Sequence, residues 1–315
     1  MDNQKFIEKN FCLSISDMSL LDCHFGTEIF IASTKYGRLI VKKVPCCMKG
    51  VENEGHITSF LCGKGIKVPR FFQTTNGEYA AHTENHQFTV QEFIDGQTFS
   101  VNSAPDWLLD QSAEILGNIN CTLCEYGELP LNFGGNFFNP DAAIGKWKYY
   151  EAELLKAKDD TELASKWEEQ ILHLKKIAGF DFIDASKLTY ANSHGDFNIC
   201  QLVVSGREVA VIDWASACNL PVCLEVMTSF VFASKKCANG AIDETGLKRY
   251  IGQYTKYFPL SDYDLRAMPY VFYFWHCVCN YTPTEQIPKS YQKIAKLISD
   301  CLNWLYSNVD DLSLA

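Results

Sequence analysis

The sequence predicts an α+β protein with two lobes: a small antiparallel-sheet lobe with one helix over residues 1–96, and a larger, mainly helical lobe over residues 97–315. Up to Gly96, short strand-like runs alternate with turn signals, and beyond it apolar residues recur at helical spacings of three and four. A chain of 315 residues that is 47% hydrophobic can also bury a large core without disulfides or metals.

The first lobe is expected to contain a β-hairpin, because two strand-like runs flank the glycine turn Lys35-Tyr36-Gly37. One helical pattern follows, from about Val51 to Cys62, and it ends before Gly63 and Pro69. These elements form a sheet-rich unit with a single helix. The expected strands are 28–34, 38–44, 79–82 and 88–93.

The second lobe is expected to be helical apart from one hairpin. That hairpin runs from Gln201 to Ile212 through the turn Ser205-Gly206, and an aspartate stands at each of its ends, Asp196 before it and Asp213 after it. Rigid backbone would therefore hold two carboxylates. The expected helices are 106–126, 140–158, 161–177, 220–236, 244–257, 263–281 and 290–308.

Charge and composition exclude several classes of protein. With 28 Lys and Arg against 38 Asp and Glu, a net charge of −10 does not suit binding to nucleic acid or to an anionic membrane surface. The most apolar stretch, 268–281, is shorter than the ~20 residues that span a bilayer. Because the first ten residues are polar and charged, unlike a signal peptide, the 14 cysteines are expected to be reduced thiols in a cytoplasmic protein.

The residues around the hairpin suit phosphoryl transfer. A carboxylate on a short loop, such as Asp196, can accept a proton from a hydroxyl, while Asp213 and a second oxygen ligand hold a divalent cation. Mg²⁺ is the expected metal because the available ligands are oxygens. The plainer alternative is that Asp196 only caps a turn and Asp213 only ends a strand.

A family resemblance supports the catalytic interpretation. His194-Gly195-Asp196-Phe197, with Gln201 five positions after Asp196 and then Ile212-Asp213-Trp214, resembles the signature of the aminoglycoside phosphotransferase-like and choline kinase-like small-molecule kinases. The resemblance implies a protein kinase-like fold over roughly residues 15–260. It also implies that Asp196 is the catalytic base, that His194 braces its loop, and that Gln201 and Asp213 bind the metal.

The resemblance extends to the first lobe. Leu39-Ile40-Val41-Lys42 is similar to the strand whose lysine orients the phosphates of ATP, and Glu54 stands where the helix supplies the partner of that lysine. Lys43 and Glu52 are the alternatives. Strand alternation turns the two lysines to opposite faces, so only one of them can reach the site.

Two more segments resemble nucleotide-binding parts of these kinases. Phe88 to Gly96 is similar to the hinge, which implies that the backbone of Gln91, Glu92 and Phe93 hydrogen-bonds adenine. Gly26 stands in the expected nucleotide loop, Cys23 to Thr27, which has this one glycine and not the G-x-G-x-x-G pattern of protein kinases.

Three positions depart from the family pattern. Gln201 replaces the metal-binding asparagine of most members, as in the maltose-kinase branch. Glu225 stands where many members have an aspartate that steadies the loop, and Asn120 replaces the histidine of an L-G-x-x-H helix end.

The resemblance implies a kinase that uses ATP and Mg²⁺ to phosphorylate a hydroxyl of a small molecule. Candidate acceptors are an amino alcohol, an aminoglycoside, a sugar or a homoserine-like compound. The main alternative is a pseudokinase, which binds a nucleotide or a partner without turnover and is favoured by Gln201 and the glycine-poor loop. A hydrolase that acts on a bound phosphate is the third possibility.

Overall fold

The structure is a computed structural model that describes residues 2–24, 26–48, 50–131, 140–156, 161–180, 182–278 and 289–314. The chain forms two compact units. The sheet unit comprises residues 1–99 and 200–217, and the helical unit comprises residues 100–199 and 218–315. The expected lobes met at residue 96, so the division differs mainly in placing residues 200–217 with the sheet.

The sheet unit is built on a five-stranded antiparallel sheet in the order β1-β2-β3-β5-β4. The predicted hairpin is confirmed: β2 and β3 pair with Thr34 opposite Gly37, whose φ of 103° lies in the region that favours glycine. The one predicted helix is α2, Val51–Gly63. The strands are β1 Ile15–His24, β2 Thr27–Thr34, β3 Gly37–Pro45, β4 Ala80–His82 and β5 His86–Glu92.

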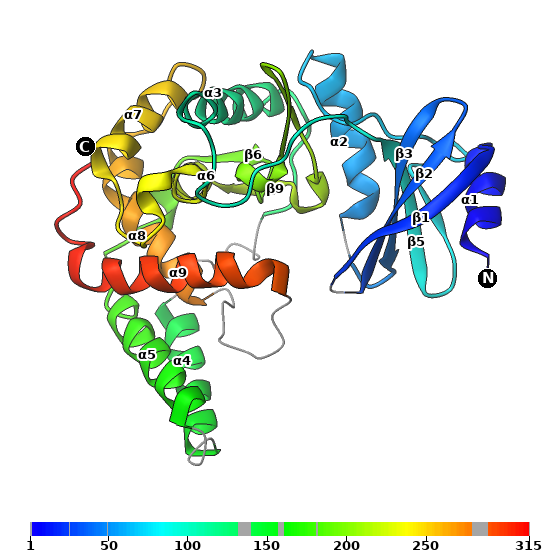
Figure 1. Cartoon of the computed structure of the whole chain (residues 1–315). Helices are drawn as coiled ribbons and strands as arrows, with labels where there is room; N and C mark the ends of the chain where they lie inside the picture. The colour runs from blue at the N-terminus through cyan, green and yellow to red at the C-terminus, as the bar shows by residue number, and fades with distance from the viewer. Residues whose placement is uncertain are drawn as a thin grey trace. The chain divides into compact units, whose positions relative to one another are not determined.

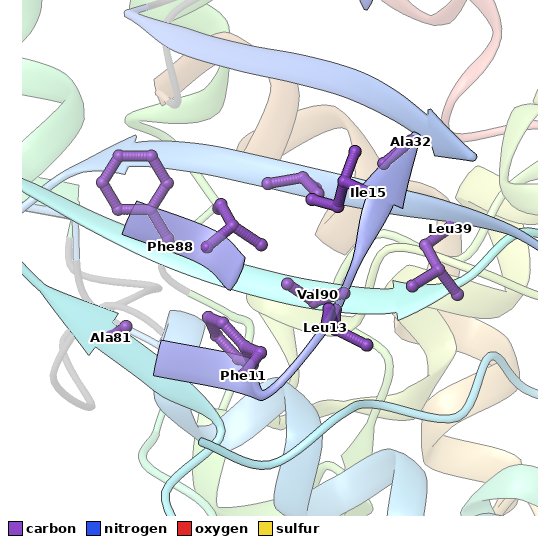
Figure 2. Close-up of a cluster of buried hydrophobic side chains, with 10 residues drawn as sticks. Phe11, Leu13, Ile15, Ala32, Leu39, Ala81, Phe88 and Val90 are labelled. Carbon is purple, nitrogen blue, oxygen red and sulfur yellow. The ribbon is translucent and has the colours of Figure 1, made fainter. Parts of the chain in front are cut away.

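A second helix in the sheet unit, α1 (Asn3–Phe11), corrects the expectation of one helix. Its apolar residues are few but lie on one face, and they complete a buried cluster with the strands (Figure 2). Each fully buried Val, Leu, Ile or Phe side chain stabilises the fold by about 1.5–3 kcal/mol relative to an exposed one. The buried cluster consists of Ile7, Phe11, Leu13, Ile15, Ala32, Leu39, Val41, Ala81, Phe88 and Val90.

The predicted hairpin near residue 205 is confirmed as β7 (Leu202–Ser205) and β8 (Glu208–Val211). It joins the sheet unit because Gln97 and Val204 exchange backbone hydrogen bonds of 2.8 and 2.9 Å. Gly96 permits this approach, since a Cβ there would lie 2.7 Å from the carbonyl oxygen of Val204. This pairing fixes the position of the open end of the hairpin within the sheet unit.

The helical unit confirms the predicted helices, with one of them starting later than expected. Residues 218–221 form β9 (Cys218–Pro221), which pairs with β6 (Tyr190–Ser193), so the helix expected from residue 220 begins at Val222. The ends predicted at 157–158 and 279–281 lie outside the described residues. In Figure 1, α4 and α5 run side by side. The helices are α3 Asp106–Leu123, α4 Pro140–Lys156, α5 Thr161–Ile177, α6 Val222–Ala233, α7 Glu244–Tyr254, α8 Asp262–Val278 and α9 Lys289–Asn308.

A membrane-spanning helix needs both length and apolar character. Within the described ranges, no helix combines the two.

Candidate active site

The sheet unit buries an ion pair between β3 and α2. The Nζ atom of Lys42 lies 2.9 Å and 3.3 Å from the two carboxylate oxygens of Glu54. The Glu54 side chain is 0% exposed and that of Lys42 is 11% exposed. A carboxylate removed from water to this extent requires a cation or several donors, so the pair fixes the position of the Lys42 ammonium group.

The neighbouring charges that were alternatives for this pair have other partners. Lys43 points to the opposite face of β3 and contacts Glu28 at 3.0 Å. Glu52 contacts a histidine of β4 at 2.6 Å, and both side chains are largely exposed. The buried contact between the strand and the helix therefore belongs to Lys42 and Glu54.

Asp213 follows β8 and is the third charged group of this cluster. Its Oδ1 atom lies 2.8 Å from the Nζ of Lys42, and its side chain is 49% exposed. The φ angle of 65° places Asp213 in the left-handed region, which costs about 1–2 kcal/mol for a residue with a Cβ. The next residue anchors it, since buried Trp214 donates its backbone N–H to Glu54 at 3.0 Å. Strain held in this way is typical of functional sites.

The charge of Lys42 is set by these two carboxylates. Burial alone would lower the pKa of Lys42, but Glu54 and Asp213 outweigh burial and raise the pKa above its ordinary value. Lys42 therefore stays protonated at physiological pH. A fixed cation beside a half-exposed carboxylate can bind a polyphosphate.

Gln201 lies at the open end of the β7–β8 hairpin, the end that carries Asp213. The backbone N–H of Ile212 donates to the carbonyl oxygen of Gln201 at 2.9 Å, which pairs the residues that flank the hairpin. A carboxylate and an amide oxygen are ligands that suit Mg²⁺. Across the described ranges, no cluster of three or more His, Cys, Asp or Glu side chains could hold a metal. A cation bound by Asp213 and Gln201 would complete its coordination with phosphate oxygens and water.

The predicted hinge lies at the end of β5. The backbone N–H of Glu92 donates to the carbonyl oxygen of Arg70 at 2.8 Å, and that of Phe93 donates to Arg38 at 3.3 Å. These two donors are therefore used inside the sheet unit. Gln91 lies within β5 and is buried, with 5% of the residue exposed.

Gly26 forms the turn between β1 and β2, where the nucleotide loop was expected. Its φ of 79° favours glycine, and a Cβ there would approach the Cγ of Pro45 to 3.2 Å. Phe25, in the same predicted loop, lies outside the described residues.

In the helical unit, Asp196 lies on the loop after β6 and is held by its neighbours. The Nδ1 atom of His194, which is fully buried, accepts from the backbone N–H of Asp196 at 3.3 Å. Asn198 donates to the carbonyl oxygen of Asp196 at 2.9 Å and to its Oδ1 at 3.1 Å. These hydrogen bonds fix the orientation of the Asp196 side chain on the loop. Sequence analysis missed Asn198, whose only signal was an amide two positions after Asp196.

Two of the departures from the family pattern also brace this loop. Glu225 on α6 accepts from the backbone N–H of Phe197 at 2.9 Å and from the hydroxyl of Ser193. Asn120 on α3 donates to the carbonyl oxygen of Asn192 at 3.0 Å and to the Ser193 hydroxyl at 2.6 Å. Both substituted residues therefore fix the backbone that leads into the loop.

The carboxyl group of Glu225 makes the stability of this loop dependent on pH. Burial raises the pKa of Glu225 to about 7. The native state thus binds a proton that the unfolded chain releases near its ordinary pKa of about 4.5, so this contribution to stability is present at low pH and is lost as pH rises through about 7.

Glu225→Gln should remove that dependence. Between about pH 5 and about pH 8, the unmodified protein should lose up to about 3 kcal/mol of unfolding free energy relative to the variant. Urea denaturation at the two pH values measures the difference. Glu114→Gln is the control, because Glu114 forms only a half-exposed pair with Lys256 at 2.9 Å. Parallel stability profiles for the unmodified protein and Glu225→Gln would contradict this account.

Known structures resemble the chain over nearly its whole length. An amicoumacin kinase solved with AMP-PNP and Ca²⁺ has a TM-score of 0.66 at 13% identity and covers 99% of this chain and 94% of its own. A spectinomycin phosphotransferase solved with ADP and spectinomycin has a TM-score of 0.61 at 10% identity, with 98% of each chain covered. A microcompartment-associated aminopropanol kinase has a TM-score of 0.59 at 14% identity, with 99% of each chain covered. At these identities, the likeness establishes the fold.

The family follows from the sequence itself. No curated protein is significantly similar to the chain. Residues 27–257, however, match the family described as the phosphotransferase enzyme family. The matched range contains every predicted site residue except Gly26. The match confirms the predicted family and enzyme class. The chain belongs to the phosphotransferase enzyme family.

Proposed function

We propose that the chain is a kinase that transfers the γ-phosphoryl group of ATP to a hydroxyl of a small molecule. The observation that carries the proposal is the buried Lys42–Glu54 pair with Asp213 beside it. An ion pair that only joined two surface side chains would not need to be buried in this way. In this proposal the sheet unit binds the nucleotide. The helical unit binds the acceptor and supplies the base. Because the reaction uses ATP, we also propose a cytoplasmic location.

The roles in the sheet unit follow from charge. Lys42 binds the α- and β-phosphates as a permanent cation, and Glu54 holds its ammonium group in place. Asp213 and Gln201 hold Mg²⁺, which neutralises phosphate charge when it is bound. Gly26 lets the turn between β1 and β2 approach the phosphates without a side chain, and the segment from Gln91 to Phe93 lies along the base.

The helical unit handles the proton. Asp196 accepts the proton of the acceptor hydroxyl as the oxygen attacks the γ-phosphorus, and the bond to the β,γ-bridging oxygen breaks. Asn198 holds the Asp196 carboxylate in position through its donated hydrogen bond of 3.1 Å. His194 holds the backbone of Asp196 and so positions the loop.

The proposed acceptor is a small hydroxyl compound that carries an amine. Two observations support it: the net charge of −10 favours a cationic ligand, and structural relatives include an aminopropanol kinase and a choline kinase from Cryptosporidium parvum. Aminoglycosides, neutral sugars and homoserine-like compounds are the other acceptors to test.

A two-step acceptor screen tests the proposed function. Compounds are first ranked by the rise in melting temperature that they cause with AMP-PNP and Mg²⁺ present, because ligands that bind only the folded state stabilise it. Those that bind are then incubated with ATP, each beside its analogue without the hydroxyl. We expect phosphorylation of an amino alcohol and none of its deoxy analogue. Nucleotide binding without turnover of any acceptor would favour the pseudokinase, and release of phosphate without an acceptor would favour the hydrolase.

The metal ligands can be tested without an acceptor. In Asp213→Ala we expect Mg²⁺ no longer to strengthen AMP-PNP binding, because the carboxylate ligand is gone. Gln201→Asn should keep the effect of Mg²⁺, since it keeps an amide oxygen. Titration calorimetry with and without Mg²⁺ measures both, and Asp17→Ala on the exposed edge of β1 is the control. A variant ranking in which Gln201→Asn loses the Mg²⁺ effect and Asp213→Ala keeps it would overturn the assignment.

A further inference from the structure

Two polar atoms on the Lys42 face of the sheet are buried without a hydrogen-bond partner among the described residues. They are the Oγ1 atom of Thr89 and the Oε1 atom of Gln91, in residues that are 0% and 5% exposed. Buried polar side-chain atoms in native proteins are nearly always paired, so each such atom calls for an explanation. One explanation is that a bound ligand supplies the missing hydrogen-bond donor.

The sheet register places both atoms on the face that carries Lys42. Thr89 is opposite Lys42, and Gln91 is opposite Ile40, two positions nearer the hinge. Residues opposite each other in an antiparallel pair point to the same face, as do residues two apart on one strand. The intervening residue Val90 points into the cluster that α1 covers (Figure 2). Gln91 is therefore displaced from Lys42 along the sheet, toward Glu92.

Two backbone donors at this end of the strand already have partners. The N–H groups of Glu92 and Phe93 are already used by Arg70 and Arg38. The side-chain oxygen of Gln91 is a buried acceptor at this end of the strand, without a partner among the described residues. A nucleotide whose phosphates bind Lys42 extends its base away from that lysine, and adenine carries a 6-amino donor at its edge.

We propose that Gln91 is a specificity-determining residue that accepts a hydrogen bond from the 6-amino group of adenine. This inference rests on the proposed function, because it requires the phosphates to bind at Lys42. A base with a 6-oxo group presents an acceptor to the Gln91 oxygen, and a base with hydrogen at that position presents nothing. The side chain would thus select ATP through one substituent.

The strand supplies a matched control. Gln87 is also on β5, on the same face, and it is 4% exposed. Its Nε2 atom donates to the carbonyl oxygens of Met48 at 2.6 Å and Pro45 at 3.3 Å. The Gln87 amide therefore has hydrogen-bond partners within the fold, whereas the oxygen of Gln91 has none among the described residues.

The test compares the affinity of three nucleotides in the presence of Mg²⁺: ATP, inosine triphosphate and the triphosphate of unsubstituted purine riboside. The unmodified protein should bind ATP about 2- to 10-fold more tightly than the unsubstituted nucleotide, as one net hydrogen bond implies, and should bind inosine triphosphate least well. In Gln91→Leu, ATP affinity should fall to that of the unsubstituted nucleotide. The melting temperature should not fall, because an unpaired polar atom is removed. Gln87→Leu should show the reverse, a lower melting temperature with the preference for ATP kept.

Two results would overturn the inference. If Gln91→Leu keeps the preference for ATP over the unsubstituted nucleotide, Gln91 does not read the base, and the proposed kinase function stands. If the unmodified protein binds none of the three nucleotides, the inference and the proposed function both fail.

Discussion

Replacement of Asp196 by Asn should lower turnover by about 10²-fold or more, the contribution typical of a general base. Asn keeps the size of the side chain but cannot accept the proton of the attacking hydroxyl. The backbone contact with His194 involves the N–H of residue 196 and survives the change. AMP-PNP affinity should stay within about 2-fold of that of the unmodified protein, because the nucleotide groups lie in the sheet unit.

Steady-state kinetics with the acceptor found by the screen measure the effect. Asp184→Asn is the matched control, because Asp184 is another loop aspartate of the helical unit and caps a short 3₁₀ turn through Ser186 at 3.1 Å. Near-full turnover by Asp196→Asn would remove Asp196 from the mechanism. A comparable loss in Asp184→Asn would point to a general disturbance of the unit.

Replacement of Lys42 by Met should lower kcat/KM for ATP by about 10²-fold or more, since a preorganised cation on the phosphates is lost. The melting temperature should fall as well, because Glu54 is left buried without its cation. Lys42→Arg separates the two effects: it keeps the charge beside Glu54 and Asp213, so the fold should survive, but the planar guanidinium cannot replace the compact ammonium group on the phosphates.

Lys43→Met is the control for Lys42. Lys43 is adjacent in sequence, but its partner Glu28 is 34% exposed and not buried as Glu54 is, so its loss should change stability by only about 0–1 kcal/mol. ATP kinetics should not change. If Lys43→Met impaired ATP use and Lys42→Met did not, the assignment of the phosphate-binding lysine would be wrong.

The fold was predictable from the sequence where the signals are local. Strand alternation, the turn at Gly37 and the helical periodicity after Gly96 gave most elements to within a few residues. Helix α1 was missed because so short an amphipathic segment becomes stable only through packing on the sheet. The grouping of the β7–β8 hairpin with the sheet rests on the pairing of Gln97 with Val204, a contact between distant segments that leaves no local pattern.

The candidate site was predictable as a set of residues but not as a set of contacts. Alternation showed that only Lys42 or Lys43 could reach the site, and the partner of each lysine separated them. The left-handed backbone of Asp213 and the loop-bracing hydrogen bonds of Asn120 and Glu225 arise from tertiary structure. The unpaired oxygen of Gln91 was also invisible, because burial and pairing are properties of the folded chain.

The most direct test of phosphoryl transfer follows the fate of the γ-phosphoryl group. ATP labelled with ¹⁸O on the three terminal γ-oxygens is incubated with the protein, Mg²⁺ and the acceptor, and the products are analysed by mass spectrometry. We expect a phosphorylated acceptor that carries all three labelled oxygens and keeps its own hydroxyl oxygen as the bridge to phosphorus. We also expect Asp196→Asn to form this product at least about 10²-fold more slowly. Labelled inorganic phosphate with no phosphorylated acceptor, or intact ATP with every acceptor that binds, would contradict the proposed phosphoryl transfer.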